Sequence, residues 1–237
     1  MRGDRVTKIA IFVEGQTERK FIRKLVGQRY GHMGIKVKEI SLRGRNSFIH
    51  ASPSRESPGL SCFFLIVEVP SYEKLVSYVK ENASNLVNTH NFGLLSGLRD
   101  LAPAKRSDKR QVISGIQRLL SDAPERDKIS ITLAVMETEA WFLCDWHMFQ
   151  RIDTRLTTAL IQSCLDLDLV NDDPELAYDH PSKTLDNILK LAQRRYRKHS
   201  REIDLVIRNL DVGHLRSNTS KIDSFFRFIT QLDSCVS

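Results

Sequence analysis

The chain has 237 residues, of which 41% are hydrophobic, and its 36 Lys and Arg against 29 Asp and Glu give a formal charge of +7. A chain of this length buries roughly 70–75% of its unfolded surface, enough to fold without disulfides or a structural metal. The longest apolar run, Cys62 to Val67, is far shorter than the roughly 20 residues that cross a membrane, so we expect no transmembrane helix.

The N-terminus and the cysteines predict a cytoplasmic protein. The charged N-terminus lacks the apolar core of a secretory signal, and the four cysteines lie far apart without C-x-x-C spacing. This spacing favours reduced thiols and argues against a structural zinc site. The excess of basic residues suggests an anionic partner such as nucleic acid, although charge alone does not establish one.

The first two-thirds of the chain alternates apolar strand-like runs with amphipathic helix-like segments. In chain order the expected strands are Lys8–Val13, Ile35–Leu42, Leu60–Val69, Phe92–Leu98 and Ile129–Met136. Helices are expected from about Thr17, which would cap the first, from Ser71 and from Asp108. The third helix is expected to bury Val112, Ile116, Leu119 and Leu120. This alternation predicts an α/β fold with a mostly parallel sheet and flanking helices.

The predicted domain organisation follows from the same patterns. We expect an α/β core over residues 1–150 and a helical C-terminal region over residues 151–237 that packs on it. Trp141 and Trp146 lie in an apolar helix-like segment and are expected in the core rather than as a base-stacking platform. The acid-rich stretch Asp166 to Asp179 is expected to be a solvated loop between helices.

Carboxylates follow three of the predicted strands. In chain order they are Glu14 after the first strand, Asp100 after the fourth, and Glu137 with Glu139 after the fifth. Ligands of open α/β sheets bind outside the carboxyl ends of the strands, so these acids converge if the strands are parallel neighbours. Clustered carboxylates repel one another, and bound Mg²⁺ or Mn²⁺ would remove that cost. The alternative for each acid taken singly is a solvated strand end.

Two motifs at these strand ends resemble a known family. Val13 to Glu18 is similar to the V-E-G-x-T-E signature that opens TOPRIM-like proteins. Met136 to Asp145 resembles the E-x-E-A-W segment of an uncharacterised bacterial TOPRIM-like family. Weaker similarity lies at His180 to Lys183 and at Ser224 to Phe228, so the matching segments span most of the chain in the expected order.

The resemblance implies a TOPRIM-like core and Mg²⁺-dependent phosphoryl-transfer chemistry on nucleic acid. By position, Glu14 matches the family's glutamate, a metal ligand or general acid/base, and Asp100 matches the aspartate after its third strand. Glu137 and Glu139 match its E-x-E pair. The family usually has an Asp-x-Asp pair where this chain has only Asp100, so a single-metal or non-catalytic site stays open beside two-metal cleavage. The resemblance also suggests a separate ATPase partner.

Two basic segments are candidates for contacting a phosphate backbone. One is the Ser-rich stretch from residue 43 to 61, with Arg43, Arg45, His50 and Arg55. The other is a helix expected from Ser182 to Arg201, whose apolar face comprises Leu185, Ile188, Leu189, Ala192 and Tyr196. Its opposite face carries Lys183, Lys190, Arg194, Arg197 and Arg201. The alternatives are an ordinary loop and a solvated helix face.

These features together favour a metal-dependent nuclease or a related phosphodiester-processing enzyme. In this hypothesis Glu14, Asp100, Glu137 and Glu139 hold Mg²⁺ or Mn²⁺, and the basic segments position the nucleic acid. A second hypothesis is a non-catalytic module, binding nucleic acid or another partner, with a degenerate metal site. A third is a phosphoester enzyme acting on nucleotides.

Overall fold

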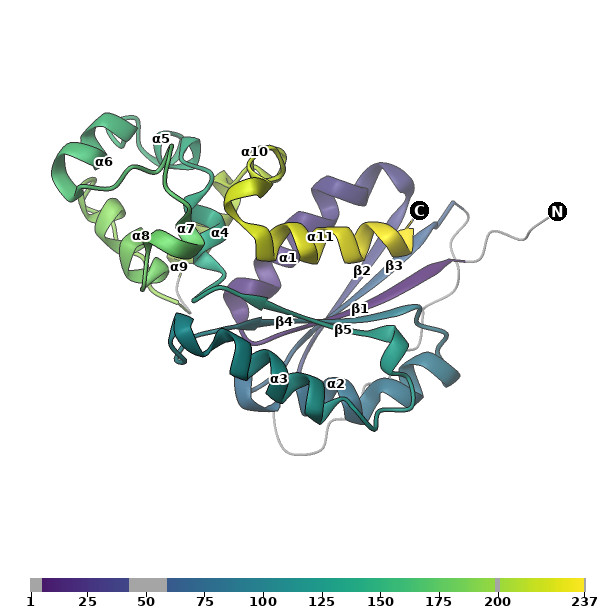
Figure 1. Ribbon diagram of the computed structural model, residues 1–237. Helices are drawn as coiled ribbons and strands as arrows, with labels where there is room; N and C mark the ends of the chain where they lie inside the picture. Colours follow the sequence, from purple (N-terminus) through teal and green to yellow (C-terminus); the bar gives the residue numbers. More distant parts are fainter. Residues whose placement is uncertain (1–5, 43–58, 199–200, 237) are drawn as a thin grey trace. The chain divides into compact units, whose positions relative to one another are not determined.

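Five strands form one parallel sheet in the order β2-β3-β1-β4-β5, which confirms the predicted α/β class (Figure 1). The computed structural model describes residues 6–42, 59–198 and 201–236. The strands are β1 (Thr7–Val13), β2 (Ile35–Ser41), β3 (Cys62–Glu68), β4 (Leu94–Asp100) and β5 (Ile129–Ala134). Each of them falls within or next to a segment that the sequence predicts as a strand.

Eleven α-helices are present in the described residues. They are α1 (Gln16–Tyr30), α2 (Leu75–Ser84), α3 (Lys109–Leu119), α4 (Glu139–Leu143), α5 (His147–Ile152), α6 (Thr158–Leu165), α7 (Pro174–Ala177), α8 (Pro181–Lys190), α9 (Arg201–Asn209), α10 (Val212–Ser217) and α11 (Asp223–Val236). Short 3₁₀ turns cover Gly31–Met33, Tyr72–Lys74, Arg106–Asp108, Arg126–Lys128 and Thr219–Lys221, and a π turn covers Asn85–Thr89. The C-terminal region is helical, as predicted.

The chain divides into two compact units. The sheet unit comprises Met1–Arg99, Arg110–Leu133 and Phe228–Ser237, and the helical unit comprises Asp100–Lys109 and Ala134–Arg227. These limits differ from a single boundary at residue 150, because the chain leaves the sheet unit where β5 ends and returns to it within α11.

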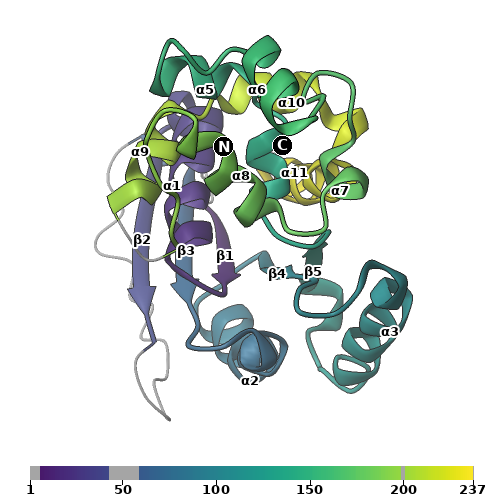
Figure 2. The same ribbon diagram turned by 90° about the vertical axis from the view of Figure 1, so that its left-hand side faces the viewer.

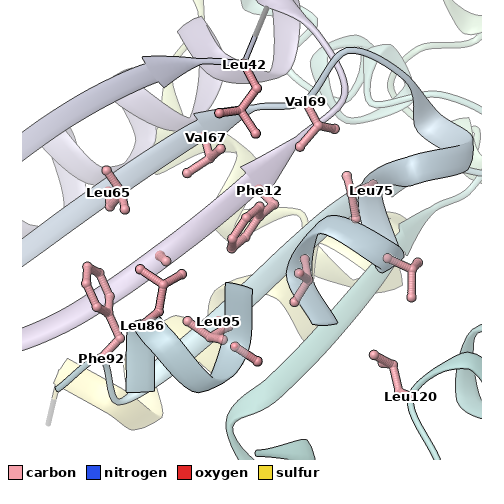
Figure 3. Packing of buried hydrophobic residues seen from close by; sticks show 14 of the residues in the cluster. Phe12, Leu42, Leu65, Val67, Val69, Leu75, Leu86, Phe92, Leu95 and Leu120 are labelled. Carbon is pink, nitrogen blue, oxygen red and sulfur yellow. The ribbon is translucent and has the colours of Figure 1, made fainter. Parts of the chain in front are cut away.

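The sheet is buried on both of its faces. Side chains of neighbouring residues in a strand point to opposite faces, and the largely apolar β1 and β3 therefore supply both layers of core. Helix α1 covers one face, where Tyr30 stacks on Phe64 at 5.3 Å between ring centroids. Helices α2 and α3 lie on the other face (Figures 1 and 2). Figure 3 shows the packing beneath them, formed by Phe12, Leu65, Val67, Leu75, Leu86, Phe92, Leu95 and Leu120.

Two predicted helix details are wrong. Helix α1 begins at Gln16 with Gly15 as its N-cap, so Thr17 is a buried residue of the first turn rather than the cap. In α3 the side chain of Leu119 is 51% exposed, whereas Ile116 and Leu120 are buried. At 100° per residue, Leu119 lies about 80° around the helix from the midpoint between Ile116 and Leu120. Its side chain therefore falls at the margin of the arc that faces the sheet.

The predicted helix from Ser182 to Arg201 is also wrong, because α8 ends at Lys190. Gln193 has a positive φ of 58°. The N–H of Gln193 donates to the carbonyl of Lys190 at 2.9 Å, and the N–H of Arg194 donates to the carbonyl of Leu189 at 3.0 Å. This pair of bonds closes a helix C-terminus as a Schellman motif, with Gln193 in the place that glycine usually takes.

The helical unit is organised around α4, which contacts α7 and α8 (Figure 1). Trp141 is fully buried, as predicted, and its indole N–H donates to Glu175 Oε1 at 3.0 Å and to Ser224 Oγ at 2.9 Å. Trp146 is only half-buried. The expected solvated loop contains α7, whose Glu175 is 4% exposed. A buried carboxylate needs hydrogen-bond donors such as the indole N–H of Trp141, so Glu175 is part of the core and not of a solvated loop. No helix of the described residues has the length and apolar character that crossing a membrane requires.

Candidate functional site

Asp100 and the segment after β5 meet in the helical unit. The N–H of Leu101 donates to the carbonyl of Ala134 at 2.9 Å, and the N–H of Ala102 donates to that of Met136 at 2.8 Å. Met136 has a positive φ of 62°, a conformation that turns the chain sharply after the strand. The two strand ends are therefore tied together by backbone hydrogen bonds, as parallel neighbours require.

Asp100 is fixed by the residue that begins α4. Its Oδ1 accepts hydrogen bonds from both the backbone N–H and the side-chain hydroxyl of Thr138, each at 2.9 Å. Thr138 is the N-cap of α4. Burial raises the pKa of the Asp100 carboxyl, although the Lys198 ammonium and the bonds from Thr138 oppose that rise and Glu137 adds to it.

Glu137 is held at the first turn of α8. Its Oε2 accepts the backbone N–H of Ser182 at 2.7 Å, and its Oε1 accepts the Ser182 hydroxyl at 2.9 Å. The first N–H groups of a helix have no partner within it, and the helix dipole there favours a negative charge. Ser182 therefore positions Glu137 through both its backbone N–H and its hydroxyl.

Glu139 is the most deeply buried carboxylate of the three, with 0% exposure. Its Oε1 accepts the phenolic hydroxyl of Tyr196 at 2.8 Å. A carboxylate oxygen of Glu139 and one of Asp100 lie within 4.8 Å of each other. Burial raises the pKa of Glu139 to about 7; the Lys198 ammonium lowers it, and the neighbouring Asp100 and Glu137 raise it further.

Lys198 contacts all three acids. Its Nζ lies 3.5 Å from Asp100 Oδ2, 3.3 Å from Glu137 Oε1 and 3.2 Å from Glu139 Oε2. The lysine side chain is 32% exposed, and its single positive charge offsets one of the three carboxylate charges. Oε2 of Glu139 is buried and accepts no hydrogen bond among the described residues, so its contact with Lys198 is an ion pair only.

The segment that follows α8 delivers Tyr196 and Lys198. Asp186 of α8 accepts the backbone N–H of Tyr196 at 2.8 Å and the Nε–H of Arg195 at 3.1 Å, which anchors the returning chain. Sequence reasoning missed both functional side chains, because the expected helix placed Tyr196 on an apolar face. The basic residues around Lys198 offer no signal that singles this lysine out.

The cluster fits a hard divalent cation by its donor chemistry. Its ligand atoms are carboxylate oxygens, which favour Mg²⁺ or Mn²⁺ over zinc. The buried Oε2 of Glu139 has no hydrogen-bond donor among the described residues, which leaves a lone-pair direction for a cation. The orienting donors from Thr138, Ser182 and Tyr196 are of the kind that hold metal-ligating carboxylates in place.

Comparison with known proteins identifies the family. Over residues 13–233 the chain matches the family described as Domain of unknown function (DUF4276). The chain belongs to this family. No curated protein and no solved structure matches the chain. The matched range of the DUF4276 chain contains every acid of the cluster, and the family's description names no activity.

Of the four predicted ligands, the structure brings Asp100, Glu137 and Glu139 together within the helical unit of the DUF4276 chain. Glu14 belongs to the sheet unit, between β1 and α1, and its participation stays a prediction. Glu18, in the first turn of α1, is buried. A Cβ at Gly15 would lie 3.1 Å from Glu18 Oε2, so glycine lets this carboxylate sit against the backbone.

Of the two predicted sets of basic residues, the structure describes only the second. Arg43, Arg45, His50 and Arg55 lie outside the described residues. Lys183 and Lys190 lie on α8, where Lys190 pairs with Asp186 at 2.8 Å. Arg194 and Arg197 follow the end of α8, and Arg201 begins α9. These five residues therefore do not form one helical stripe, because the Schellman motif ends the helix before Arg194.

Proposed function

We propose that this DUF4276 protein is a divalent-metal-dependent nuclease or related phosphodiester hydrolase, with its reaction centre at Asp100, Glu137 and Glu139. The observation that carries the proposal is that three carboxylates, of which Asp100 and Glu139 are buried, all lie within 3.5 Å of the Lys198 ammonium. Burying carboxylates without full compensation is costly, and acids perturbed in this way cluster at functional sites. The V-E-G-x-T-E and E-x-E-A-W resemblances support the same chemistry.

Mg²⁺ or Mn²⁺ would be held by Asp100, Glu137 and Glu139, and when bound would polarise a phosphate oxygen and promote ionisation of a water molecule. The chain's own residues prepare that site. Thr138 and Ser182 fix Asp100 and Glu137 through paired backbone and hydroxyl donors, and Tyr196 orients Glu139. These contacts reduce the rearrangement that each carboxylate would need during reaction.

Lys198 has a separate part in this proposal. Its ammonium, on a flexible four-carbon stem, is partly exposed while it contacts the acids. When a divalent cation is held by the carboxylates, Lys198 would be available to contact a non-bridging oxygen of the phosphate. The lysine would then stabilise charge on the phosphate group rather than on the protein.

The test uses the full chain with plasmid DNA, single-stranded DNA and RNA, in Mg²⁺, in Mn²⁺ and in EDTA. We expect cleavage that requires metal and that falls at least ~100-fold in Asp100→Asn and in Glu139→Gln. Asp127→Asn, which changes an exposed acid paired with Lys128, is the matched control. Cleavage that persists in EDTA or in both site variants would refute the proposal, and Glu14→Ala tests whether the predicted fourth ligand contributes.

A second candidate function is a non-catalytic nucleic-acid or partner-binding module. It is favoured by the ion pairs of Lys198 with all three acids. It is also favoured by Leu98 and Ala102, which flank Asp100 at the positions where TOPRIM proteins usually have a second aspartate. This candidate predicts salt-sensitive binding without cleavage, and calorimetry without a heat of Mg²⁺ binding. A heat of binding that disappears in Glu139→Gln would exclude it.

A further inference from the structure

The outward face of α3 in the sheet unit carries no acid. Arg110, Gln111, Ser114, Gln117 and Arg118 are all exposed. At 100° per residue these five positions occupy an arc of about 120°, opposite the buried Ile116. Helix α3 contains no Asp or Glu, so the face combines cations with neutral hydrogen-bonding side chains.

The two arginines of this face are unpaired within the part of the chain that the structure describes. Neither Arg110 nor Arg118 has a hydrogen bond or an ion pair from its guanidinium there. By contrast, Arg19 pairs with Glu39 on the same unit. An exposed guanidinium without an internal partner is available to a phosphate, and Gln and Ser side chains are also common phosphate contacts.

A cavity with an apolar wall adjoins α3. It has a volume of about 390 Å³ and is lined by Val76, Ser77, Lys80, Glu81, Leu119 and Pro124. Leu119 is half-exposed at this cavity and follows Arg118 directly in the chain. Lys80 is paired with Asp122, and the lining also includes the exposed acid Glu81 of α2. The positive charge beside this cavity therefore lies on α3 rather than on α2.

Gly115 lies between the polar face and Leu119 in the helical projection. A Cβ built on Gly115 would meet no heavy atom within 4 Å, so this stretch of the helix surface is uncovered. Unpaired cations are thus next to an accessible apolar wall. Duplexes present phosphates but keep their base faces stacked, whereas single strands present both phosphates and unstacked bases.

We propose that the exposed face of α3 and the adjoining cavity bind single-stranded nucleic acid, with phosphates on Arg110 and Arg118 and an unstacked base against Leu119. The inference rests on the proposed function and deepens it by naming the substrate class. Binding measured in EDTA distinguishes the two proposals. Binding by a protein that shows no cleavage would support the α3 surface and refute the proposed function. Cleavage by a protein that does not bind single strands through α3 would refute this inference and leave the proposed function in place.

The experiment measures the anisotropy of a labelled single-stranded oligothymidine and oligouridine with the full chain in EDTA, over a range of salt concentrations. Arg110→Gln and Arg118→Gln should each weaken binding several-fold and lower the slope of log K against log salt by about 0.7. Gly115→Asp should weaken binding roughly tenfold, because it places a negative charge between the arginines and Leu119. Gly115→Ala tests the same position without charge and should change affinity less than about twofold.

Gly27 on α1 supplies the matched control, since a Cβ there also meets nothing within 4 Å. Gly27→Asp changes the net charge equally and should leave binding within about twofold. Equal losses in Gly27→Asp and Gly115→Asp would overturn the proposal. So would a duplex of the same length bound as tightly as the single strand, or displacement of the oligonucleotide by equimolar oligoglutamate, which would assign the face to an acidic protein segment.

Discussion

Glu139→Gln provides a test of the carboxylate cluster that does not depend on activity. The change removes a negative charge from a fully buried side chain while keeping its shape. The new amide keeps a polar contact with each neighbour, because its oxygen faces the Lys198 ammonium and its NH₂ can donate to the hydroxyl oxygen of Tyr196. The variant therefore changes the electrostatic free energy of the site more than its packing.

The magnitude follows from the pKa of Glu139, which burial raises from 4.5 to about 7. At about 1.4 kcal/mol per pH unit, ionised Glu139 costs the folded metal-free protein about 3 kcal/mol relative to the unfolded chain. A raised carboxyl pKa means that the folded state binds the proton more tightly. Its contribution to stability is complete below pH 4.5 and is lost as the pH rises towards and through 7.

The assay is urea unfolding in EDTA at about pH 5 and about pH 8, on either side of the raised pKa, followed by tryptophan fluorescence. Both tryptophans of the chain, Trp141 and Trp146, belong to the helical unit and report on it. The wild type should lose about 2.5 kcal/mol more than Glu139→Gln between the two pH values, because part of the contribution is already lost at pH 5. Mg²⁺ at the higher pH should restore stability to the wild type alone. The reasoning would be refuted if the stability of Glu139→Gln fell in parallel with that of the wild type between the two pH values. It would also be refuted if Glu139→Gln were less stable than the wild type at the higher pH.

Three further predictions concern Lys198 and the sheet unit. Lys198→Gln removes a cation that competes with Mg²⁺ for the carboxylates, so calorimetry should find Mg²⁺ binding about fivefold tighter. The rate of cleavage should fall in the same variant. Weaker Mg²⁺ binding would contradict this prediction. Phe12→Ala leaves a cavity in the packing of Figure 3 and should lower the free energy of unfolding by about 3–5 kcal/mol, whereas the exposed Leu119→Ala should change it by less than about 1 kcal/mol. Gly115→Ala should raise the thermal midpoint, with a gain of about 0.5–1 kcal/mol, because alanine fits the open position and limits the unfolded chain; a loss of stability would show that the position is covered.

The fold class was predictable because its signals are local. Buried parallel strands need continuous apolar runs, and β1, β3 and β4 have them in the sequence. The start of α1 was less predictable, since Gly15 caps it without a side chain. The end of α8 could not be predicted from the spacing of apolar residues. Ala192 and Tyr196 continue the helical spacing and are buried, but both lie after the last residue of α8.

The proximity of the acids was predictable as far as it follows from their positions at the ends of parallel strands. Parallel neighbours bring Asp100 beside the segment after β5, and the spacing of the E-x-E pair then supplies both glutamates. Lys198 was not predictable, because its position depends on the positive φ of Gln193 and on the anchoring of the returning chain by Asp186. Nothing in single-sequence patterning indicates that a glutamine closes the helix there.

The local contacts also separate the two candidate functions. Asp100 and Glu137 each accept a backbone N–H at the beginning of a helix, so both acids have a structural reason to be where they are. Glu139 has no such reason, because its partners are the Tyr196 hydroxyl and the Lys198 ammonium. In a purely structural core, an apolar residue or a glutamine would stabilise this position better than an acid whose ionisation is unfavourable. We therefore expect the charge at position 139 to serve a bound cation, and Glu139→Gln, rather than a change at Asp100 or Glu137, distinguishes a metal centre from an inert cluster.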